Sequence, residues 1–232
     1  MAGPQYSLGM SVTSKTFLDM YQAMLARFGH QGWWPGDGAL EICVGAILTQ
    51  NTNWTNVQRA IANLKGAAIM SVTALHAAGR EKLAELIRPA GYYNVKAARL
   101  LHFIAAVHER NGDDIEAFLS RPIDALREEL LSISGIGRET ADSMILYAAG
   151  KPTFVVDTYT YRILLRHRLI APEDDYETIK ELMESHLPLD VELWKDYHAQ
   201  LVAVGKHFCR PAARCPGCPL EGFPHDPTSG DW

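Results

Sequence analysis

The sequence lacks the features of a membrane-spanning or exported protein. No stretch of its 232 residues approaches the ~18 consecutive apolar residues that a transmembrane helix requires. The amino-terminal segment MAGPQYSLGMSV has no cationic region followed by an apolar one, so we expect no signal peptide there. The hydrophobic fraction of 47% is nevertheless enough for a globular core. We therefore expect a globular protein in a compartment of the bacterial cytoplasmic type.

Positive charge is also scarce. The formal net charge is −5, which by itself does not indicate a nucleic-acid-binding protein. The charges are unevenly placed, however. Nine acids lie between Pro172 and Asp196, whereas the segments 88–102 and 205–218 each carry three Lys or Arg and no acid. Such basic patches can meet phosphates locally, and ordinary solvated surface charge is the alternative.

Strand-like alternation of apolar and polar residues is rare, and no repeat of fixed long period is present. Apolar residues recur instead at helical spacing, so the sequence predicts an all-α fold. Ser14 and Gly29 are expected to cap and end the first helix, and Asn94 to cap a later one. Apolar residues at helical spacing mark two further helices, between residues 54 and 64 and between residues 83 and 87. Others are predicted over residues 40–49, 123–132, 138–149, 158–168, 176–186 and 191–204.

Two segments in the middle of the chain indicate chemistry. The turn Gly135-Ile136-Gly137 separates two predicted helices, and its glycines allow positive φ and a close approach of another backbone. Free N–H groups at the start of the second helix could bind an anion such as a phosphate diester. Further on, Asp157 follows an apolar run and precedes a helix. A structural turn and a helix-capping aspartate are the alternatives.

In combination these segments resemble a known family. GIGRETAD followed by VVDTYTYRIL resembles the helix-hairpin-helix and Gly/Pro-Asp motif of the endonuclease III superfamily of DNA glycosylases. GAILTQNT, RPAGYYNVKAARL and VGKHFCR resemble other segments of that family, so the resemblance covers about Leu40 to Cys218. It implies a two-domain all-α helix-hairpin-helix DNA glycosylase fold with a cleft between the domains. Residues 38–149 would form a six-helix domain, and residues 1–37 with 150–232 a second helical domain ending in a Cys-rich loop.

The resemblance also implies roles for particular residues. Asp157 would be the catalytic carboxylate that stabilises an oxocarbenium-like sugar and positions water. Gln50 would fill the gap left by a base flipped out of damaged double-stranded DNA. We expect DNA contacts from Gln50, Asn51, Asn94, Lys96, Gly135, Ile136, Gly137, Arg138 and Thr140.

Position 139 separates two kinds of glycosylase. Members of the family that also cut the backbone carry a lysine there, whose amine forms a Schiff base with the sugar. This chain has Glu139, so we expect it to leave an abasic site without lyase activity. A second class of function is a catalytically silent DNA-binding module, and Asp157 argues against it. A third is a metal-sensing or structural protein, and the irregular cysteine spacing argues against that.

The flanking segments look closest to bacterial 3-methyladenine DNA glycosylases of the endonuclease III type. The implied substrate is an alkylated purine such as 3-methyladenine, with mismatched or oxidised bases as the alternative. The implied protein is a nucleoid-associated monomer. Lys206 could equally be a phosphate contact or a solvated lysine, and single aromatic residues usually fill cores. The base pocket would comprise Trp34, Pro35, Trp54, Glu139 and Lys206.

The cysteines form an incomplete version of the family's cluster loop. Cys209, Cys215 and Cys218 have spacings of five and two residues, and the expected fourth position falls at Pro224, beside His225. Three alternatives stay open: a [4Fe–4S] cluster with His225 as the fourth ligand, a loop without metal, and a zinc site of the Cys3His kind. The remaining cysteine of the chain, Cys43, lies far from this loop in the sequence and is expected to be a packed core thiol.

Overall fold

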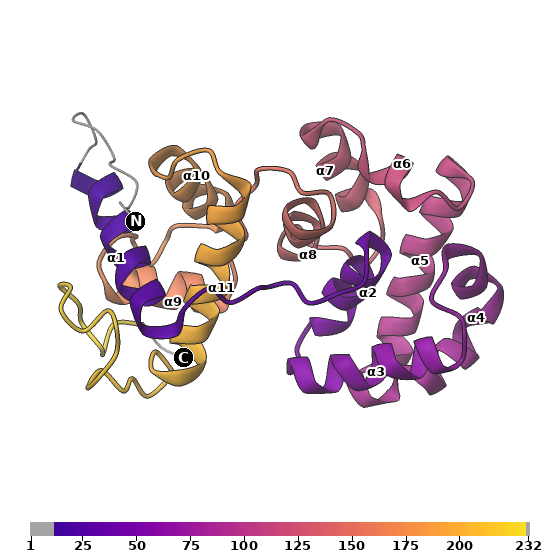
Figure 1. Cartoon of the computed structure of the whole chain (residues 1–232), viewed down its shortest axis with the longest axis horizontal. Helices are drawn as coiled ribbons and strands as arrows, with labels where there is room; N and C mark the ends of the chain where they lie inside the picture. The colour runs from indigo at the N-terminus through magenta and orange to yellow at the C-terminus, as the bar shows by residue number, and fades with distance from the viewer. Residues whose placement is uncertain (1–11, 231–232) are drawn as a thin grey trace. The chain divides into compact units, whose positions relative to one another are not determined.

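A computed structural model describes residues 12–230 (Figure 1). Residues 1–11 and 231–232 lie outside the described residues. The prediction that the amino-terminal segment MAGPQYSLGMSV is not a signal peptide therefore falls almost entirely outside them. Every regular element in the described range is helical, which confirms the all-α prediction. Within the same range, no helix is both long and apolar enough to cross a membrane.

The chain divides into two compact units. The central unit comprises residues 34–153, and the terminal unit comprises residues up to 33 together with those from 154 onward. The boundaries expected from the sequence, at residues 38 and 149, lie a few residues inside these limits; that the units are separate folding domains stays a prediction.

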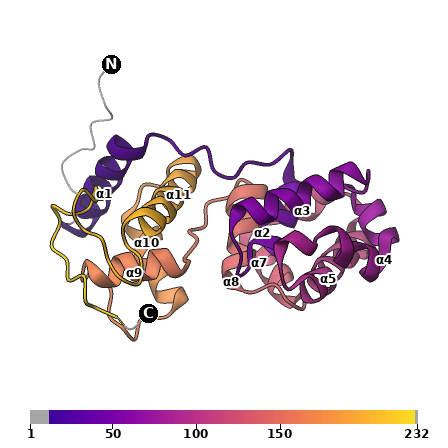
Figure 2. The same ribbon diagram turned by 90° about the horizontal axis from the view of Figure 1, so that it is seen from below.

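The central unit is built around α2 (Ala39–Thr49), an almost wholly buried helix that packs against four other helices of this unit and the π-helical segment η2. The helices α4 and α5 pack side by side in both views (Figures 1 and 2). The remaining elements are α3 (Trp54–Gly66), α4 (Val72–Leu86), η1 (Arg88–Ala90), α5 (Tyr93–Asn111), α6 (Ile115–Leu119), α7 (Ile123–Ser132), α8 (Arg138–Ser143) and η2 (Met144–Ala148).

The predicted helix limits are met at some ends and missed at others. The helix predicted at 123–132 is found as predicted. The helix predicted at 138–149 is α8 followed by the π-helical segment η2. Asn94 was wrongly expected to be a cap: α5 begins at Tyr93, after Tyr92 in the left-handed conformation (φ 45°). The short helix α6, capped by Asp114, was not expected, because five residues carry too little periodicity to be recognised.

The terminal unit joins the two ends of the chain. Its elements are α1 (Val12–Phe28), α9 (Thr158–Arg166), α10 (Tyr176–His186) and α11 (Val191–His207). Both α1 and α9 pack on α11. Ser14 was wrongly expected to cap α1, since it lies inside that helix. Gly29 does end α1: its φ is +69° and its N–H donates to Leu25 O at 2.8 Å.

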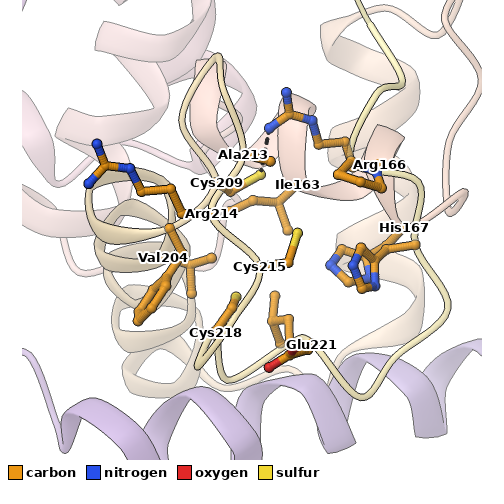
Figure 3. A pocket seen from close by; sticks show the side chains of 14 residues that line it. Ile163, Arg166, His167, Val204, Cys209, Ala213, Arg214, Cys215, Cys218 and Glu221 are labelled. Carbon is orange, nitrogen blue, oxygen red and sulfur yellow. Dashed lines mark hydrogen bonds between the residues drawn. The ribbon is translucent and has the colours of Figure 1, made fainter.

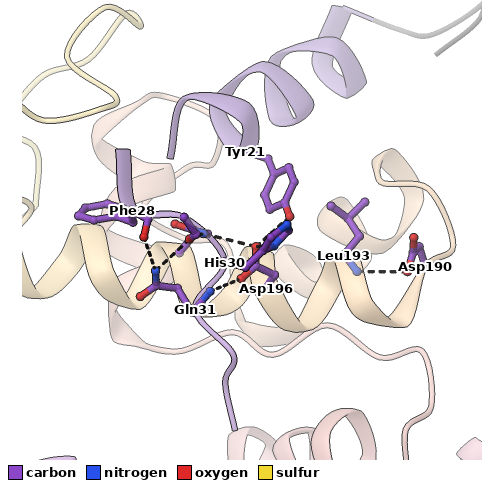
Figure 4. Close-up of polar contacts among 9 residues, drawn as sticks. Tyr21, Phe28, His30, Gln31, Asp190, Leu193 and Asp196 are labelled. Atoms are coloured by element: carbon purple, nitrogen blue, oxygen red, sulfur yellow. Dashed lines mark hydrogen bonds and ion pairs between the residues drawn. The ribbon is translucent and has the colours of Figure 1, made fainter. Parts of the chain in front are cut away.

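Acidic residues between 172 and 196 have structural roles in this unit. Asp175 caps α10 and Asp190 caps α11. Asp196 accepts hydrogen bonds from the Tyr21 hydroxyl (2.8 Å) and the Gln31 backbone N–H (2.9 Å) (Figure 4). Burial would raise the pKa of Asp196, but these hydrogen bonds hold it below the usual value. The segment that follows α1 is thereby fixed to α11.

Candidate functional site

The two glycines of the hairpin between α7 and α8 differ in what their positions require. Gly135 has φ +94°, and a Cβ placed there would lie 2.3 Å from Arg99 Cγ. Gly137 has extended backbone, caps α8, and a Cβ there would meet no atom within 4 Å. Gly135 is therefore required by the turn itself, whereas Gly137 keeps the space in front of α8 open.

Two hairpin residues that were expected to contact DNA are turned inward instead. The Ile136 side chain is buried, and its N–H donates to Ile133 O at 3.0 Å. Thr140 is buried too, with its hydroxyl accepting a hydrogen bond from Gln50. The Ile136 prediction is corrected, because its N–H and side chain serve the turn and the core. Arg138 and Glu139 are exposed in the first turn of α8.

Gln50 is held by three hydrogen bonds, two of them to the hairpin and one to α5. Its Nε2 atom donates to Thr140 Oγ1 at 2.9 Å and to Gly135 O at 3.3 Å. Its Oε1 atom accepts a hydrogen bond from the Arg99 guanidinium. Asn51, the next residue, is exposed and has φ +54°, a conformation that asparagine tolerates. Arg99 on α5 thus helps to hold the Gln50 side chain against the hairpin, a contact that sequence reasoning missed.

Lys96 is the clearest correction among the predicted DNA contacts. Its side chain is only 1% exposed, and Nζ donates to Leu48 O at 2.9 Å and Ala90 O at 2.8 Å. Burial, assisted by the nearby charge of Arg99, lowers the pKa of Lys96 to about 8. Lys96 therefore joins η1 to the end of α2 and does not present its charge to a phosphate. Asn94, in contrast, is exposed at the start of α5.

Two predicted pocket residues meet in the central unit. The rings of Trp34 and Trp54 lie 5.4 Å apart, nearly perpendicular, and Trp34 also lies 5.5 Å from Tyr147. We call these three residues the aromatic cluster. Gly45 makes room for it, because a Cβ at Gly45 would lie 2.9 Å from Trp34 Nε1. Tyr147 comes from the π-helical segment η2, and such segments are frequent at functional sites.

Lys206 belongs to a different unit from the aromatic cluster. It is exposed on α11, and its Nζ lies 5.7 Å from the centre of the Trp33 ring. The division between the units falls between Trp33 and Trp34, so these adjacent tryptophans have different surroundings. Pro35, the remaining pocket residue, is exposed beside Trp34.

Asp157 caps α9 and faces a histidine. One carboxylate oxygen, Oδ1, accepts hydrogen bonds from the Thr160 N–H (2.7 Å) and hydroxyl (2.9 Å). The other, Oδ2, lies 3.7 Å from Nε2 of His198, and the Asp157 side chain is 12% exposed. Burial alone would raise the pKa of Asp157, but the His198 imidazole and the Thr160 hydrogen bonds outweigh it and lower the pKa. Asp157 is therefore a fixed, ionised carboxylate at neutral pH.

Position 139 carries no amine, and Lys151, which follows the hairpin in the sequence, is engaged in hydrogen bonds. The Lys151 ammonium donates to Leu119 O at 2.8 Å and also contacts Arg121 O. Burial lowers the pKa of Lys151. The ammonium group therefore caps carbonyl groups at the end of α6 and just after it.

The three loop cysteines (Cys209, Cys215 and Cys218) line one pocket of the terminal unit (Figure 3). His167 and His225 line the same pocket. Burial raises the pKa of Cys215, and raises that of Cys218 to about 11. In the separate core of the central unit Cys43 is fully buried, as expected, and burial raises its pKa as well.

The donor set of this pocket fits a cluster better than a single ion. Among residues 12–230, no group of three His, Cys, Asp or Glu side chains converges as ligands of one metal ion, which gives the zinc alternative no support. A [4Fe–4S] cluster instead takes ligands spread around a cavity, and it takes thiolates and imidazoles. The buried Arg166 guanidinium donates to Cys209 Sγ at 3.3 Å, which favours an anionic sulfur there. The residues present fit the group.

Comparisons with known proteins agree with the hairpin and the Asp157 segment. A family profile described as "HhH-GPD superfamily base excision DNA repair protein" matches residues 44–188. A protein of Methanocaldococcus jannaschii, provisionally named a DNA repair glycosylase, is 46% identical over 205 residues, covering 88% of this chain and 93% of the relative. Because that relative is archaeal, it gives the expected bacterial source no support. Endonuclease III of Thermotoga maritima is 31% identical over 173 residues, covering 73% of this chain and 74% of that protein.

Solved structures share the fold. The structure of an H. pylori 3-methyladenine DNA glycosylase bound to 1,N6-ethenoadenine matches with a TM-score of 0.73 and 29% identity, covering 84% of this chain and 97% of that one. A non-covalent complex of endonuclease III with DNA matches with a TM-score of 0.79 at 21% identity, covering 94% and 97%. The profile match includes both the Gly135–Gly137 turn and Asp157. The chain belongs to the HhH-GPD superfamily of base excision DNA repair proteins.

Proposed function

We propose that this protein is a monomeric, monofunctional DNA glycosylase that removes an alkylated purine, such as 3-methyladenine, from double-stranded DNA and leaves an abasic site. The observation that carries the proposal is the geometry of Asp157, whose Oδ1 is fixed by Thr160 and whose Oδ2 is directed to His198, an arrangement that lowers the pKa of the carboxyl group. A fixed negative charge is what a reaction with a developing oxocarbenium ion requires.

The proposed reaction is a hydrolysis at C1′ of the sugar. The N-glycosidic bond breaks with its electron pair going to the base, so a cationic alkylpurine leaves as a neutral molecule. Asp157 stabilises the positive charge that develops on the sugar. A water oxygen then bonds to C1′, and Asp157 accepts the proton that the water loses. Because the substrate base already carries the positive charge, no strong acid has to protonate it.

The aromatic cluster supports the substrate class. Indole and phenol faces stack on a flipped base and attract cations by ~0.5–2 kcal/mol. The likeness to the H. pylori 3-methyladenine glycosylase, at 29% identity, supports the same class. We assign Trp34, Trp54 and Pro35 to base recognition, with Glu139 and Lys206 as further contacts.

The DNA backbone is assigned to groups that the structure leaves exposed. We propose that a phosphate binds at the start of α8, where Gly137 keeps the space open and Arg138 is exposed. Asn51 and Asn94 are proposed as further contacts, and Gln50 is proposed to leave its hairpin hydrogen bonds when it fills the gap of a flipped base.

The test is base release from defined DNA. The purified full chain is incubated with methylated double-stranded DNA, and the released bases are identified by chromatography and mass spectrometry. We expect 3-methyladenine, with strands that stay intact until alkali is added. Release only from mismatched or oxidised duplexes would overturn the substrate class, and binding without any release would identify a silent DNA-binding module.

A further inference from the structure

The chain lacks the fourth cysteine of the family's loop, and a histidine from another element lies at the place where it is missing. The expected fourth position falls at Pro224. The Pro224 carbonyl oxygen lies 3.1 Å from Nδ1 of His167, at the end of α9. The tail is fixed there a second time, since the Asp226 N–H donates to Arg166 O at 2.7 Å. The last turn of α9 therefore fills the position next to the missing thiol.

Four donors surround one space in the terminal unit. Figure 3 shows the sulfur atoms of the loop cysteines and the ring of His167 around the same pocket, which is also lined by apolar side chains such as Ile163 and Val204. The three thiols come from the loop after α11, and the imidazole comes from His167 at the end of α9. The spacing of the cysteines does not point to His167 as a ligand, because two helices, α10 and α11, separate it from Cys209 in the sequence.

We infer that Nε2 of His167 is the fourth ligand of a [4Fe–4S] cluster that the three loop cysteines hold. With Nδ1 paired to the Pro224 carbonyl, Nε2 is the remaining nitrogen, and a hydrogen bond of this kind fixes the orientation of a ligating imidazole. The three thiols each release a proton on ligation, and the neutral imidazole releases none. The assignment does not depend on the proposed glycosylase activity.

His167 is favoured over His225 by its anchoring. The two rings are 5.4 Å apart, so both lie near the space in question. Nδ1 of His225 pairs with Phe223 O, within the same irregular tail. His167 instead adjoins Arg166, whose guanidinium donates both to Cys209 Sγ and to the carbonyls of Arg210 and Pro211. One end of α9 thus contacts the cysteine loop at several points and presents the imidazole from a fixed helix.

The experiment uses the full chain, purified and reconstituted without oxygen. We expect about four iron and about four sulfide per chain, and a nitrogen coupling from 15N-labelled histidine in pulsed electron paramagnetic resonance of the reduced protein. In His167→Ala the coupling disappears and the cluster falls to about three iron. In the matched control His225→Ala both the coupling and the iron content stay. Circular dichroism checks that each variant is folded.

A second variant keeps the inference testable if His167→Ala does not fold. His167→Cys should retain about four iron, lose the nitrogen coupling and shift the reduction potential to a more negative value, because imidazole ligands raise cluster potentials. Loss of the coupling in His225→Ala but not in the His167 variants would overturn the assignment. So would protein that takes up no iron on reconstitution, or that binds zinc alone.

Discussion

Nε2 of His198 lies 3.7 Å from Oδ2 of Asp157, so the catalytic candidate faces a buried imidazole. The same carboxylate also caps α9. A capping role and a catalytic role make different predictions, and the chain contains the control that separates them.

Asp157→Asn should lower single-turnover base release by ~10²–10³-fold and leave DNA affinity within a few-fold, because it removes the charge that stabilises the sugar. Asp175 is the matched control: it caps α10 through Thr178 N–H (3.0 Å) and hydroxyl (2.9 Å), as Asp157 caps α9 through Thr160. Both substitutions remove a capping carboxylate, so both should lower the free energy of unfolding. Asp175→Asn should leave the rate of base release unchanged. Equal rates in both variants would restrict Asp157 to helix capping.

The pH dependence of base release should follow the lowered pKa of Asp157. A carboxylate whose folded pKa lies below its usual value stays ionised down to about pH 4, and the stability it contributes is lost only as pH falls through the folded pKa. His198→Gln removes the largest of the interactions that lower this pKa, so the acidic limb of the rate profile should move to higher pH. Single-turnover rates measured from pH 3.5 to 8 test this, and an unmoved limb would mean that His198 does not act on Asp157.

The two hairpin glycines should behave differently. Gly135→Ala forces a side chain into positive φ and against Arg99, so the free energy of unfolding should fall by about 1–3 kcal/mol. Gly137→Ala meets open space and should change it by less than about 0.5 kcal/mol. In an Arg99→Ala background Gly135→Ala should cost less, since the two closest contacts, with Arg99 Cγ and Cδ, are removed while the positive φ remains. Chemical denaturation of the four variants gives these values directly.

DNA titration of Gly137→Val tests the phosphate site. The bulky side chain should weaken binding to damaged and undamaged duplexes by the same factor, because phosphate contacts carry no sequence information. A loss confined to damaged DNA would contradict a phosphate site at the start of α8.

Lys96 should matter for stability and not for DNA binding. Its folded pKa, about 8, lies below its usual value, so between pH 8 and pH 10 the unfolded chain binds more protons at this residue than the folded chain does. The unfolding free energy of the wild type, measured relative to that of Lys96→Met, should therefore rise with pH across this range. DNA affinity per folded molecule should be the same in both proteins. A several-fold loss of affinity in Lys96→Met would restore its predicted role as a DNA contact.

Borohydride added during turnover should trap no covalent adduct between protein and DNA. An imine requires an amine near C1′, and Glu139 offers none. Gel electrophoresis of the reduced mixture detects any adduct, and a trapped adduct that is lost in Lys206→Ala would identify a lyase with a relocated nucleophile.

Sequence reasoning succeeded where local pattern determines structure. The helices at 123–132 and 176–186 were predicted to the residue, because their apolar spacing and flanking residues agree. It failed where the partner is distant. The sequence around Lys96 does not show that its ammonium group donates to Leu48 O. The sequence around His167 does not show that its ring contacts Pro224 O.

The candidate site shows the same division. Asp157 and the Gly135–Gly137 turn belong to short motifs and could be found from the sequence. Tyr147 and His198 lie outside the quoted motifs and Arg99 lies inside one, but the contacts of all three arise from packing between segments far apart in the chain, which the sequence does not show.

The discontinuous terminal unit has a consequence for synthesis on the ribosome. Its first helix, α1, packs on α11 and is tied to Asp196, but α11 emerges only after the whole central unit has been made. Chains are extended at about 5–20 residues per second, so α1 waits roughly 10–35 seconds for its partner while the central unit can already fold. During that interval the apolar face of α1 is an exposed surface on the nascent chain, and limited proteolysis of stalled chains should cleave α1 until α11 has left the exit tunnel.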